Sequence, residues 1–234
     1  MELSGQVVII TGAAGNLGRA VAAAFAEAGA RRVLLDNNAQ GLASAFGKDS
    51  ADQIAMVADL ADQDSLRKAV EAAQAKFGRV HVLCNLAGGF RMGHPVHDTP
   101  ADVWRLMIDL NAGSLLNMAH AVVPHMIAAG AGKIVNVAAM GGLRGAANMG
   151  AYAAAKSAVM RLTESMSAEL RDKNINVNCV LPSIIDTPAN RADMPKADPS
   201  RWVEPRALAD VIVFLASARA RAIHGASLPV VGLS

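Results

Sequence analysis

The feature that most restricts the fold of this chain is the alternation of short, almost wholly apolar runs with longer Ala-rich segments. Strands are predicted at residues 7–10, 33–35, 54–57, 80–83, 134–137, 175–181 and 228–231. Helices are predicted at residues 17–28, 66–77 and 152–172. Strands that are apolar throughout are buried on both faces, which is typical of a parallel sheet covered by helices on each side. The sequence therefore predicts one doubly wound α/β domain over residues 1–234, with a parallel sheet of about seven strands.

A further helix start is predicted at Thr99, whose hydroxyl would act as the N-cap, with Pro100 at the first helical position and Asp102 in the first turn. This helix extends toward Ala129, either unbroken or interrupted. The loop before it, residues 88–98, leaves the carboxyl end of the fourth strand. Ligands of open α/β sheets bind at that edge, so this loop is expected at a ligand site.

Charge and composition exclude several classes of function. The chain has 22 basic and 20 acidic residues without a basic stripe, which argues against nucleic acid and anionic membranes as partners. The longest stretch without Asp, Glu, Lys or Arg, residues 110–132, contains Asn111 and His120 and is not predicted to span a membrane. Two cysteines, Cys84 and Cys179, are expected to be buried thiols. Because no targeting segment is visible, the protein is expected to be cytoplasmic.

A glycine-rich loop, residues 11–18, follows the first strand and leads into the first helix. Small residues at this place let the backbone approach a pyrophosphate, which the helix N-terminus also attracts. Asp36 ends the second strand, where a carboxylate accepts hydrogen bonds from an adenosine ribose and repels a 2′-phosphate. The alternative is a solvated turn residue beside Asn37 and Asn38, but the glycine loop favours the ribose role. NAD(H) is therefore expected, and NADP(H) is less favoured.

Six motifs in this order resemble those of the short-chain dehydrogenase/reductase family. They are Thr11-Gly12 to Gly18 (TGxxxGxG), Asp59-Leu60 after the third strand, Asn85-Leu86-Ala87-Gly88 (NNAG), Asn111 in a helix, Tyr152 to Lys156 (YxxxK), and Pro182 to Thr187 (PGxIxT). The resemblance covers essentially the whole chain. It implies a Rossmann-type fold, an NAD(H)-dependent oxidoreductase acting on a small molecule, and a homotetramer or homodimer formed through two long helices.

The resemblance also implies which residues bind the cofactor. They are Gly12, Asn16, Leu17, Gly18, Asp36, Asp59, Leu60, Asn85, Ala87, Gly88, Tyr152, Lys156, Pro182, Ile185 and Thr187. No metal site is expected, because His94, His97 and Asp98 lack a further ligand at suitable spacing. Residues 189–204 occupy the place of a short segment that covers the substrate.

The catalytic residues implied by the resemblance are Tyr152, Lys156 and Asn111. Residues four apart share one face of a helix, so the Lys156 ammonium is expected to lower the pKa of the Tyr152 phenol. Tyr152 would protonate the substrate oxygen, Lys156 would also hold the nicotinamide ribose, and Asn111 would organise a relay water. The alternative makes Tyr152 a packing residue and Lys156 a solvated charge. The full set of motifs around the only tyrosine of the chain favours the catalytic role.

The sequence departs from the family pattern at four positions. Asn16, Leu86 and Ser183 replace residues of the glycine loop, of NNAG and of PGxIxT. These changes are expected to be tolerated, because the backbone does the binding there and Asn accepts a left-handed conformation at position 16. The fourth departure concerns catalysis: Ala139 stands 13 residues before Tyr152, where the family has a catalytic serine.

Three hypotheses of function follow. The leading one is an NAD(H)-dependent oxidoreductase that interconverts a carbonyl compound and an alcohol, or reduces a similar small acceptor. A narrower one is an enzyme similar to quinonoid dihydropteridine reductases, which also lack the serine. The third, from another class, is a catalytically impaired protein that binds NAD(H) as a regulatory ligand.

Overall fold

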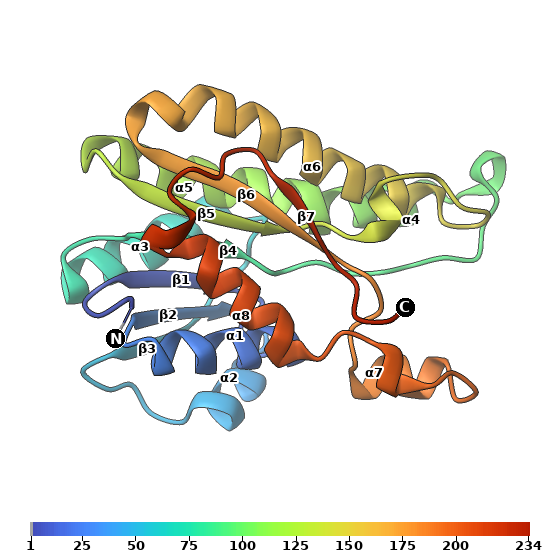
Figure 1. Ribbon diagram of the computed structural model, residues 1–234, viewed down its shortest axis with the longest axis horizontal. Coiled ribbons are helices and arrows are strands. Elements are labelled where there is room, and N and C mark those ends of the chain that lie inside the picture. The colour runs from blue at the N-terminus through green and yellow to red at the C-terminus, as the bar shows by residue number, and fades with distance from the viewer. Residues whose placement is uncertain (1) are drawn as a thin grey trace.

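The strands of the sheet all run parallel, in the order β3-β2-β1-β4-β5-β6-β7. The computed structural model describes residues 2–234 (Figure 1). The strands are β1 (Val7–Thr11), β2 (Arg31–Asp36), β3 (Gln53–Val57), β4 (Val82–Asn85), β5 (Gly132–Val137), β6 (Ile175–Pro182) and β7 (Ser227–Val230). This sheet confirms the predicted doubly wound, Rossmann-type α/β fold.

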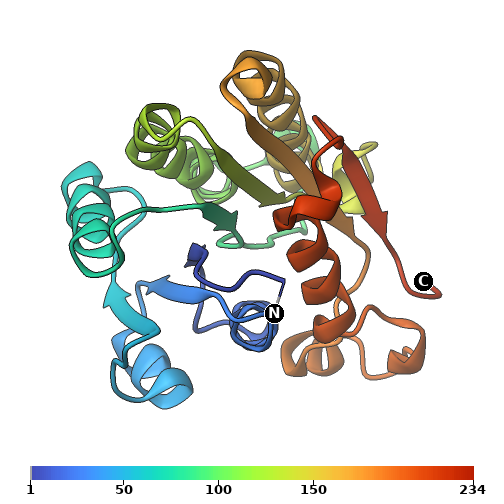
Figure 2. The same ribbon diagram turned by 60° about the vertical axis from the view of Figure 1, so that its left-hand side comes forward.

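Helices cover both faces of the sheet (Figure 2). They are α1 (Asn16–Glu27), α2 (Ala39–Phe46), α3 (Gln63–Phe77), α4 (Ala101–Ile108), α5 (Ser114–Ala128), α6 (Gly150–Leu170), α7 (Pro188–Asp193) and α8 (Pro205–Ala216). In β1, Val7 and Ile9 belong to the core shared with α3, α5 and α6, whereas Val8 and Ile10 belong to the core shared with α1 and α8. All four are fully buried, because successive strand side chains point to opposite faces. The unbroken apolar run of this strand is explained by two buried faces.

The helix start predicted at Thr99 is wrong by one residue. α4 begins at Ala101, and the first intrahelical bond runs from Trp104 N–H to the carbonyl of Pro100 (3.0 Å), which therefore occupies the N-cap position. The Thr99 hydroxyl donates instead to the carbonyl of Pro95 (3.1 Å). It closes the 3₁₀ turn at Val96–Asp98 and does not cap the helix.

α4 and α5 form one continuous helical run, joined by a π-helical turn at Asp109–Gly113. Over Ala101–Ala128 this run is long and apolar enough to cross a membrane by length and composition alone, with 44% of its apolar window buried inside the fold. Its buried side chains, Leu115 and Val122 among them, lie in the core on one face of the sheet. Core helices of soluble proteins satisfy the same test of length and composition.

Both cysteines are free and buried, as predicted. Cys84 lies in β4 and Cys179 in β6, and burial raises the pKa of each thiol. His94 and His97 are exposed, and no group of three or more His, Cys, Asp or Glu side chains within residues 2–234 is arranged to hold a metal ion.

Strand order reverses between β1 and β4, because the chain crosses from one half of the sheet to the other after β3. The loops that follow these two strands diverge and leave a crevice at the carboxyl edge of the sheet. The glycine-rich loop and residues 86–98 therefore face each other at this edge.

The burial of His81 predicts a stability that depends on pH. The N–H of Val7 donates to Nδ1 of His81 (3.0 Å), and burial together with the nearby Arg79 lowers the pKa of His81 below 6.5. A base whose pKa is depressed in the fold contributes stability above its unfolded value of 6.5, and this contribution is lost as pH falls through the folded-state pKa. We expect the melting temperature to fall from about pH 8 to about pH 5, by roughly 2–4 °C for each kcal/mol lost.

Thermal melts of His81→Asn test this expectation, because the Asn Oδ1 accepts the same bond without titrating. The fall in melting temperature should be smaller in His81→Asn than in the wild type. His120→Asn is the matched control, since His120 is exposed, and it should behave as the wild type does. Equal falls in all three proteins would contradict the role of His81.

Candidate active site

A cavity of about 520 Å³ opens at the carboxyl edge of the sheet, between the loops after β1 and β4. Ten of the predicted cofactor residues line it: Gly12, Asn16, Leu17, Gly18, Asp36, Asp59, Leu60, Ala87, Gly88 and Thr187. Its size is within the range of ligand pockets. The structure therefore brings together residues from β1, β2, β3, β4 and the segment after β6.

The glycine-rich loop is packed too tightly to accept side chains at two positions. A Cβ on Gly18 would lie 2.2 Å from the carbonyl oxygen of Gly12. A Cβ on Gly12, which has φ +65°, would lie 3.0 Å from the Cα of Ala87. The Thr11 hydroxyl also accepts the N–H groups of Leu86 (3.1 Å) and Ala87 (3.2 Å). The two loops that border the cavity are thus held against each other by backbone contact.

Asn16 does not use the left-handed conformation that we expected it to tolerate. It is the first residue of α1, and the non-glycine residues with positive φ within residues 2–234 are Asn148 and Asn174. Gly15 before it also has a negative φ, −70°. A glycine at position 16 is unnecessary because the helix has already begun there.

Asp36 joins the end of β2 to the glycine-rich loop. Its Oδ2 accepts the N–H of Ala14 (3.0 Å), and its Oδ1 accepts the N–H of Asn38 (2.9 Å). Each carboxylate oxygen has a further lone pair for a ligand. The turn contact and a ligand contact are therefore compatible, and the side chain lines the cavity.

Asn111 and Lys156 meet directly behind Gly88. A Cβ on Gly88 would lie 2.7 Å from Oδ1 of Asn111 and 3.2 Å from Nζ of Lys156. Asn111 lies in the π-helical turn, 3% exposed, and its Nδ2 donates to the carbonyls of Met107 (2.9 Å) and Gly89 (3.1 Å). Its Oδ1 accepts the N–H of Gly89 (3.2 Å). Two of the predicted catalytic residues therefore adjoin the cavity through a position that lacks a side chain.

The pKa of Tyr152 shifts in the direction opposite to our expectation. Burial raises the pKa of Tyr152 to about 12 and lowers the pKa of Lys156 to about 8. The ammonium of Lys156 donates to the carbonyl of Val137 (2.9 Å), which fixes its direction. Removal from water disfavours the charged form of each group, which raises the pKa of the phenol and lowers that of the ammonium.

Five predicted cofactor residues do not line the cavity: Tyr152 and Lys156, which lie on α6, and Asn85, Pro182 and Ile185. Asn85 is buried at the end of β4, and its Nδ2 donates to Oδ1 of Asn136 (2.8 Å), whose own Nδ2 donates to Thr163 (2.9 Å). Pro182 ends β6 beside β7, and Ile185 pairs with Val203 in an isolated bridge. Within the predicted segment from Pro182 to Thr187, only Thr187 reaches the cavity wall.

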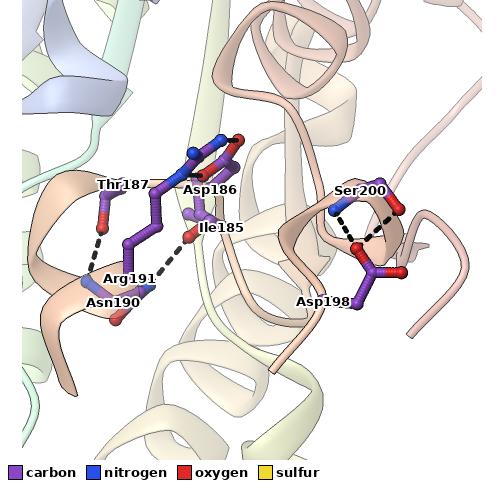
Figure 3. A network of polar contacts seen from close by, with 7 residues as sticks. All are labelled: Ile185, Asp186, Thr187, Asn190, Arg191, Asp198 and Ser200. Atoms are coloured by element: carbon purple, nitrogen blue, oxygen red, sulfur yellow. Dashed lines mark hydrogen bonds and ion pairs between the residues drawn. The ribbon is translucent and has the colours of Figure 1, made fainter. Parts of the chain in front are cut away.

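Polar contacts brace the segment after β6 (Figure 3). Arg191 donates through two nitrogens to the Asp186 carboxylate (2.6 and 2.7 Å), and this partner lowers the pKa of Asp186. Asn190 bonds to the Ile185 carbonyl (2.8 Å) and to the Thr187 hydroxyl (3.2 Å), which caps α7. These contacts hold Thr187, at the start of α7, in a defined position beside the cavity.

Sequence reasoning missed one wall of the cavity. Leu106, Leu110 and Ser114, from α4, the π-helical turn and α5, line it together with Asp109. Leu106, Leu110 and Ser114 are spaced four apart and therefore share one side of the helical run. This periodicity was visible in the sequence. The other lining residues that were not predicted are Gly15, Asn37, Ala58, Ala61 and Leu86.

Comparison with known proteins identifies the family. The short chain dehydrogenase family model matches residues 6–198. The chain belongs to the short-chain dehydrogenase family. It is 33% identical to D-threitol dehydrogenase of Mycolicibacterium smegmatis, over 99% of this chain and 93% of the relative, and 32% identical to cyclohexanol dehydrogenase of an Acinetobacter species, over 99% and 95%.

A solved structure of this family is similar over almost the whole chain. NAD⁺-bound xylitol dehydrogenase superposes with a TM-score of 0.90 at 27% identity, over 99% of this chain and 100% of the other. The protein is therefore a short-chain dehydrogenase, an NAD(P)-dependent oxidoreductase that transfers hydride to or from a small molecule.

The short turn that follows Ala139 lies against Tyr152 and Lys156. Ala139 precedes a 3₁₀ turn, Met140–Gly142, and is 7% exposed. A Cβ on Gly141 would lie 3.4 Å from Cε1 of Tyr152, and one on Gly142 would lie 2.9 Å from the carbonyl carbon of Lys156. The turn that begins at Ala139 thus contacts both members of the YxxxK motif, but Ala139 has no hydroxyl to offer there.

Ser183 uses its hydroxyl, although its family counterpart is a glycine. The hydroxyl donates to the carbonyl of Val231 (2.8 Å) and shares a hydrogen bond with the hydroxyl of Ser234 (2.7 Å). Arg201 adds a bond from Nη2 to the carbonyl of Leu233 (2.7 Å). The last four residues are therefore tied to the segment that follows β6.

Proposed function

We propose that this short-chain dehydrogenase uses NAD(H) to interconvert an alcohol and a carbonyl compound, with Tyr152 as the acid and base. The observation that supports this most directly is the placement of Asn111 and Lys156 behind Gly88, at the wall of the cavity. Tyr152 lies one helical turn before Lys156 on α6.

The residues at the cavity fit a dinucleotide. Gly12 and Gly18 leave the backbone bare at the N-terminus of α1, where N–H groups and the helix dipole favour a pyrophosphate. Asp36 would hold the adenosine ribose, and Asp59 with Leu60 would contact the adenine. Ala87, Gly88 and Thr187 would border the nicotinamide, with Asn85, Pro182 and Ile185 supporting their backbone from behind. When bound, the nicotinamide supplies or accepts the hydride.

The chain's own residues handle the proton. Because the pKa of Tyr152 is raised to about 12, the phenol is protonated at neutral pH and can donate to a carbonyl oxygen as that oxygen gains charge. In the direction of alcohol oxidation the phenolate accepts this proton. Lys156 supports the phenolate and the nicotinamide ribose, and Asn111, held by Gly89 and Met107, positions a relay water.

The cofactor preference is the first test. Asp36 places a negative charge where NADPH has its 2′-phosphate, so we expect NADPH to bind at least about tenfold more weakly than NADH. Asp36→Asn should narrow this difference, because the repulsion is removed while the amide oxygen keeps one of the two backbone N–H bonds. Titration of nicotinamide fluorescence measures both affinities.

Asp59→Asn is the matched control, since Asp59 also lines the cavity and its Oδ1 also accepts a backbone N–H, that of Ala61 (2.9 Å). This variant should change the affinities for NADH and NADPH in parallel. Equal affinities of the wild type for the two cofactors would show that Asp36 does not select NAD(H).

A steady-state panel of alcohols, ketones, quinones and quinonoid dihydropterin, each with NAD⁺ or NADH, tests the reaction. Turnover of alcohols and ketones supports the proposal. Turnover of dihydropterin alone supports the narrower alternative, and tight NADH binding without turnover of any compound supports the regulatory alternative. No specific contact within residues 2–234 favours either alternative.

A further inference from the structure

The side chain of Phe90 lies directly on Tyr152. The two ring centroids are 4.8 Å apart and the ring planes meet at 86°, an edge-to-face arrangement. Phe90 is nevertheless 45% exposed, so much of this residue remains accessible to solvent or to a ligand. Only eight residues of the chain are aromatic, which makes a Phe beside the sole tyrosine a specific feature of this site.

The loop that carries Phe90 is fixed on both sides. Gly89, before it, exchanges two hydrogen bonds with the Asn111 side chain (3.2 and 3.1 Å). Gly93, after it, donates its N–H to the carbonyl of Asn148 in the loop before α6 (2.9 Å). Phe90 therefore occupies a defined place in the site, because its loop is bonded to the π-helical turn on one side and to the loop before α6 on the other.

Both loops also carry exposed apolar side chains, interspersed with exposed polar ones such as Arg91 and His94. Met92 is 56% and Val96 76% exposed on the loop of Phe90, and Leu143 is 51% exposed on the loop before α6. Val96 reaches the start of α6, where a Cβ on Gly150 would lie 2.7 Å from its Cγ2. Both loops thus carry exposed hydrocarbon side chains, and Phe90 is the one in direct contact with Tyr152.

We propose that Phe90 is a specificity-determining residue, forming an apolar wall beside the Tyr152 hydroxyl that selects alcohols and ketones with a hydrocarbon body. This inference rests on the proposed function. An apolar substrate body gains free energy in proportion to the surface it buries against the Phe90 ring, whereas a polyhydroxylated body loses hydration against this ring, which has no polar atom to bond it. The wall also keeps water from the phenol, in agreement with the raised pKa of Tyr152.

The test compares cyclohexanol with 2-propanol as substrates of the protein with NAD⁺. In Phe90→Ala, kcat/KM for cyclohexanol should fall by about fivefold or more, while that for 2-propanol, which has little surface to bury, should change by less than about twofold. Phe90→Leu should restore most of the loss. Trp104→Ala is the matched control, because Trp104 is 47% exposed on α4 and, among residues 2–234, its ring forms no aromatic pair with Tyr152, and it should change neither value.

A second measurement does not depend on turnover. Because Tyr152 is the only tyrosine, the ultraviolet absorbance of phenolate titrates this residue alone. Its midpoint in Phe90→Ala should lie about half a pH unit or more below that of the wild type, since water gains access. An equal loss for both alcohols, or coincident midpoints in the two proteins, would overturn the inference.

Failure of the proposed function gives a different result. If the wild type oxidises neither alcohol, the substrate panel above decides the proposed reaction, and binding of cyclohexanone in the presence of NADH decides the role of Phe90. Weaker cyclohexanone binding in Phe90→Ala would still support the apolar wall. Equal binding in the wild type and the variant would overturn it.

Discussion

Replacing Tyr152 with Phe should lower kcat by about 10²–10⁴-fold, the usual contribution of a positioned acid or base. The variant keeps the ring that packs against Phe90 and removes only the hydroxyl. Since the hydroxyl is needed for proton transfer, the affinity for NADH should stay within about twofold of the wild-type value. Steady-state rates and NADH titrations of both proteins provide the measurement.

Thr163→Val is a suitable control for this variant. It removes a hydroxyl from the same helix, where Thr163 is fully buried, accepts from Asn136 and donates to the carbonyl of Val159 (2.8 Å). This control should lose stability but keep the turnover of the folded protein. If Tyr152→Phe instead retained wild-type turnover with NADH bound normally, the proton would have to come from another group.

Replacing Ala139 with Ser should raise kcat/KM on simple ketones by at least about tenfold. Loss of one preorganised donor to a developing oxyanion typically costs about 10²–10³ in rate, so restoring such a donor should recover part of this factor. Ala139 precedes the turn whose Gly141 and Gly142 lie against Tyr152 and Lys156, and the change to Ser adds a single hydroxyl. For electron-poor acceptors kcat/KM should rise less, because the negative charge that develops on them needs less stabilisation by the added hydroxyl.

Ala147→Ser is the corresponding control. Ala147 is exposed in the loop before α6, and the same added hydroxyl there should leave the rate on ketones unchanged. NADH affinity should be equal in the wild type and both variants. A normal NADH affinity without any gain in Ala139→Ser would mean that another group already serves as the donor, or that the pocket is not built for carbonyl reduction.

The strands could be predicted because two-sided burial leaves a plain signal in the sequence. Runs such as Val7 to Ile10 contain no polar residue, and their order with the intervening helices determines a doubly wound sheet. α2 was missed because it is short and its start depends on Asn38, whose Oδ1 accepts the N–H of Gly41 (2.9 Å). Asn is common both at helix N-caps and in turns, so the local sequence did not distinguish a helix start from a turn at this position.

Cavity residues could be predicted where a motif or the end of a strand places them. Residues that reach the cavity through the packing of a helix could not be predicted in this way. Asp36 follows a strand and was found, whereas Leu106 reaches the cavity only because α4 packs across the carboxyl edge. The pKa of Tyr152 was predicted in the wrong direction for a similar reason. Spacing shows that Lys156 is one turn away, but not that Phe90 and the surrounding fold bury the phenol.

The contacts of Ser183 and Arg201 with the last four residues bear on how the protein should be handled at the bench. An affinity tag or surface linkage attached after Ser234 would lie at the carboxyl edge of the sheet. It would disturb the hydrogen bonds of Ser183 and Arg201, and with them the segment that carries Thr187. The amino end lies at the opposite edge, where the N–H of Leu3 bonds to the carbonyl of Ala28 (3.0 Å), and the two ends are well separated in Figure 1. Immobilisation through the amino end therefore leaves the catalytic side of the molecule free.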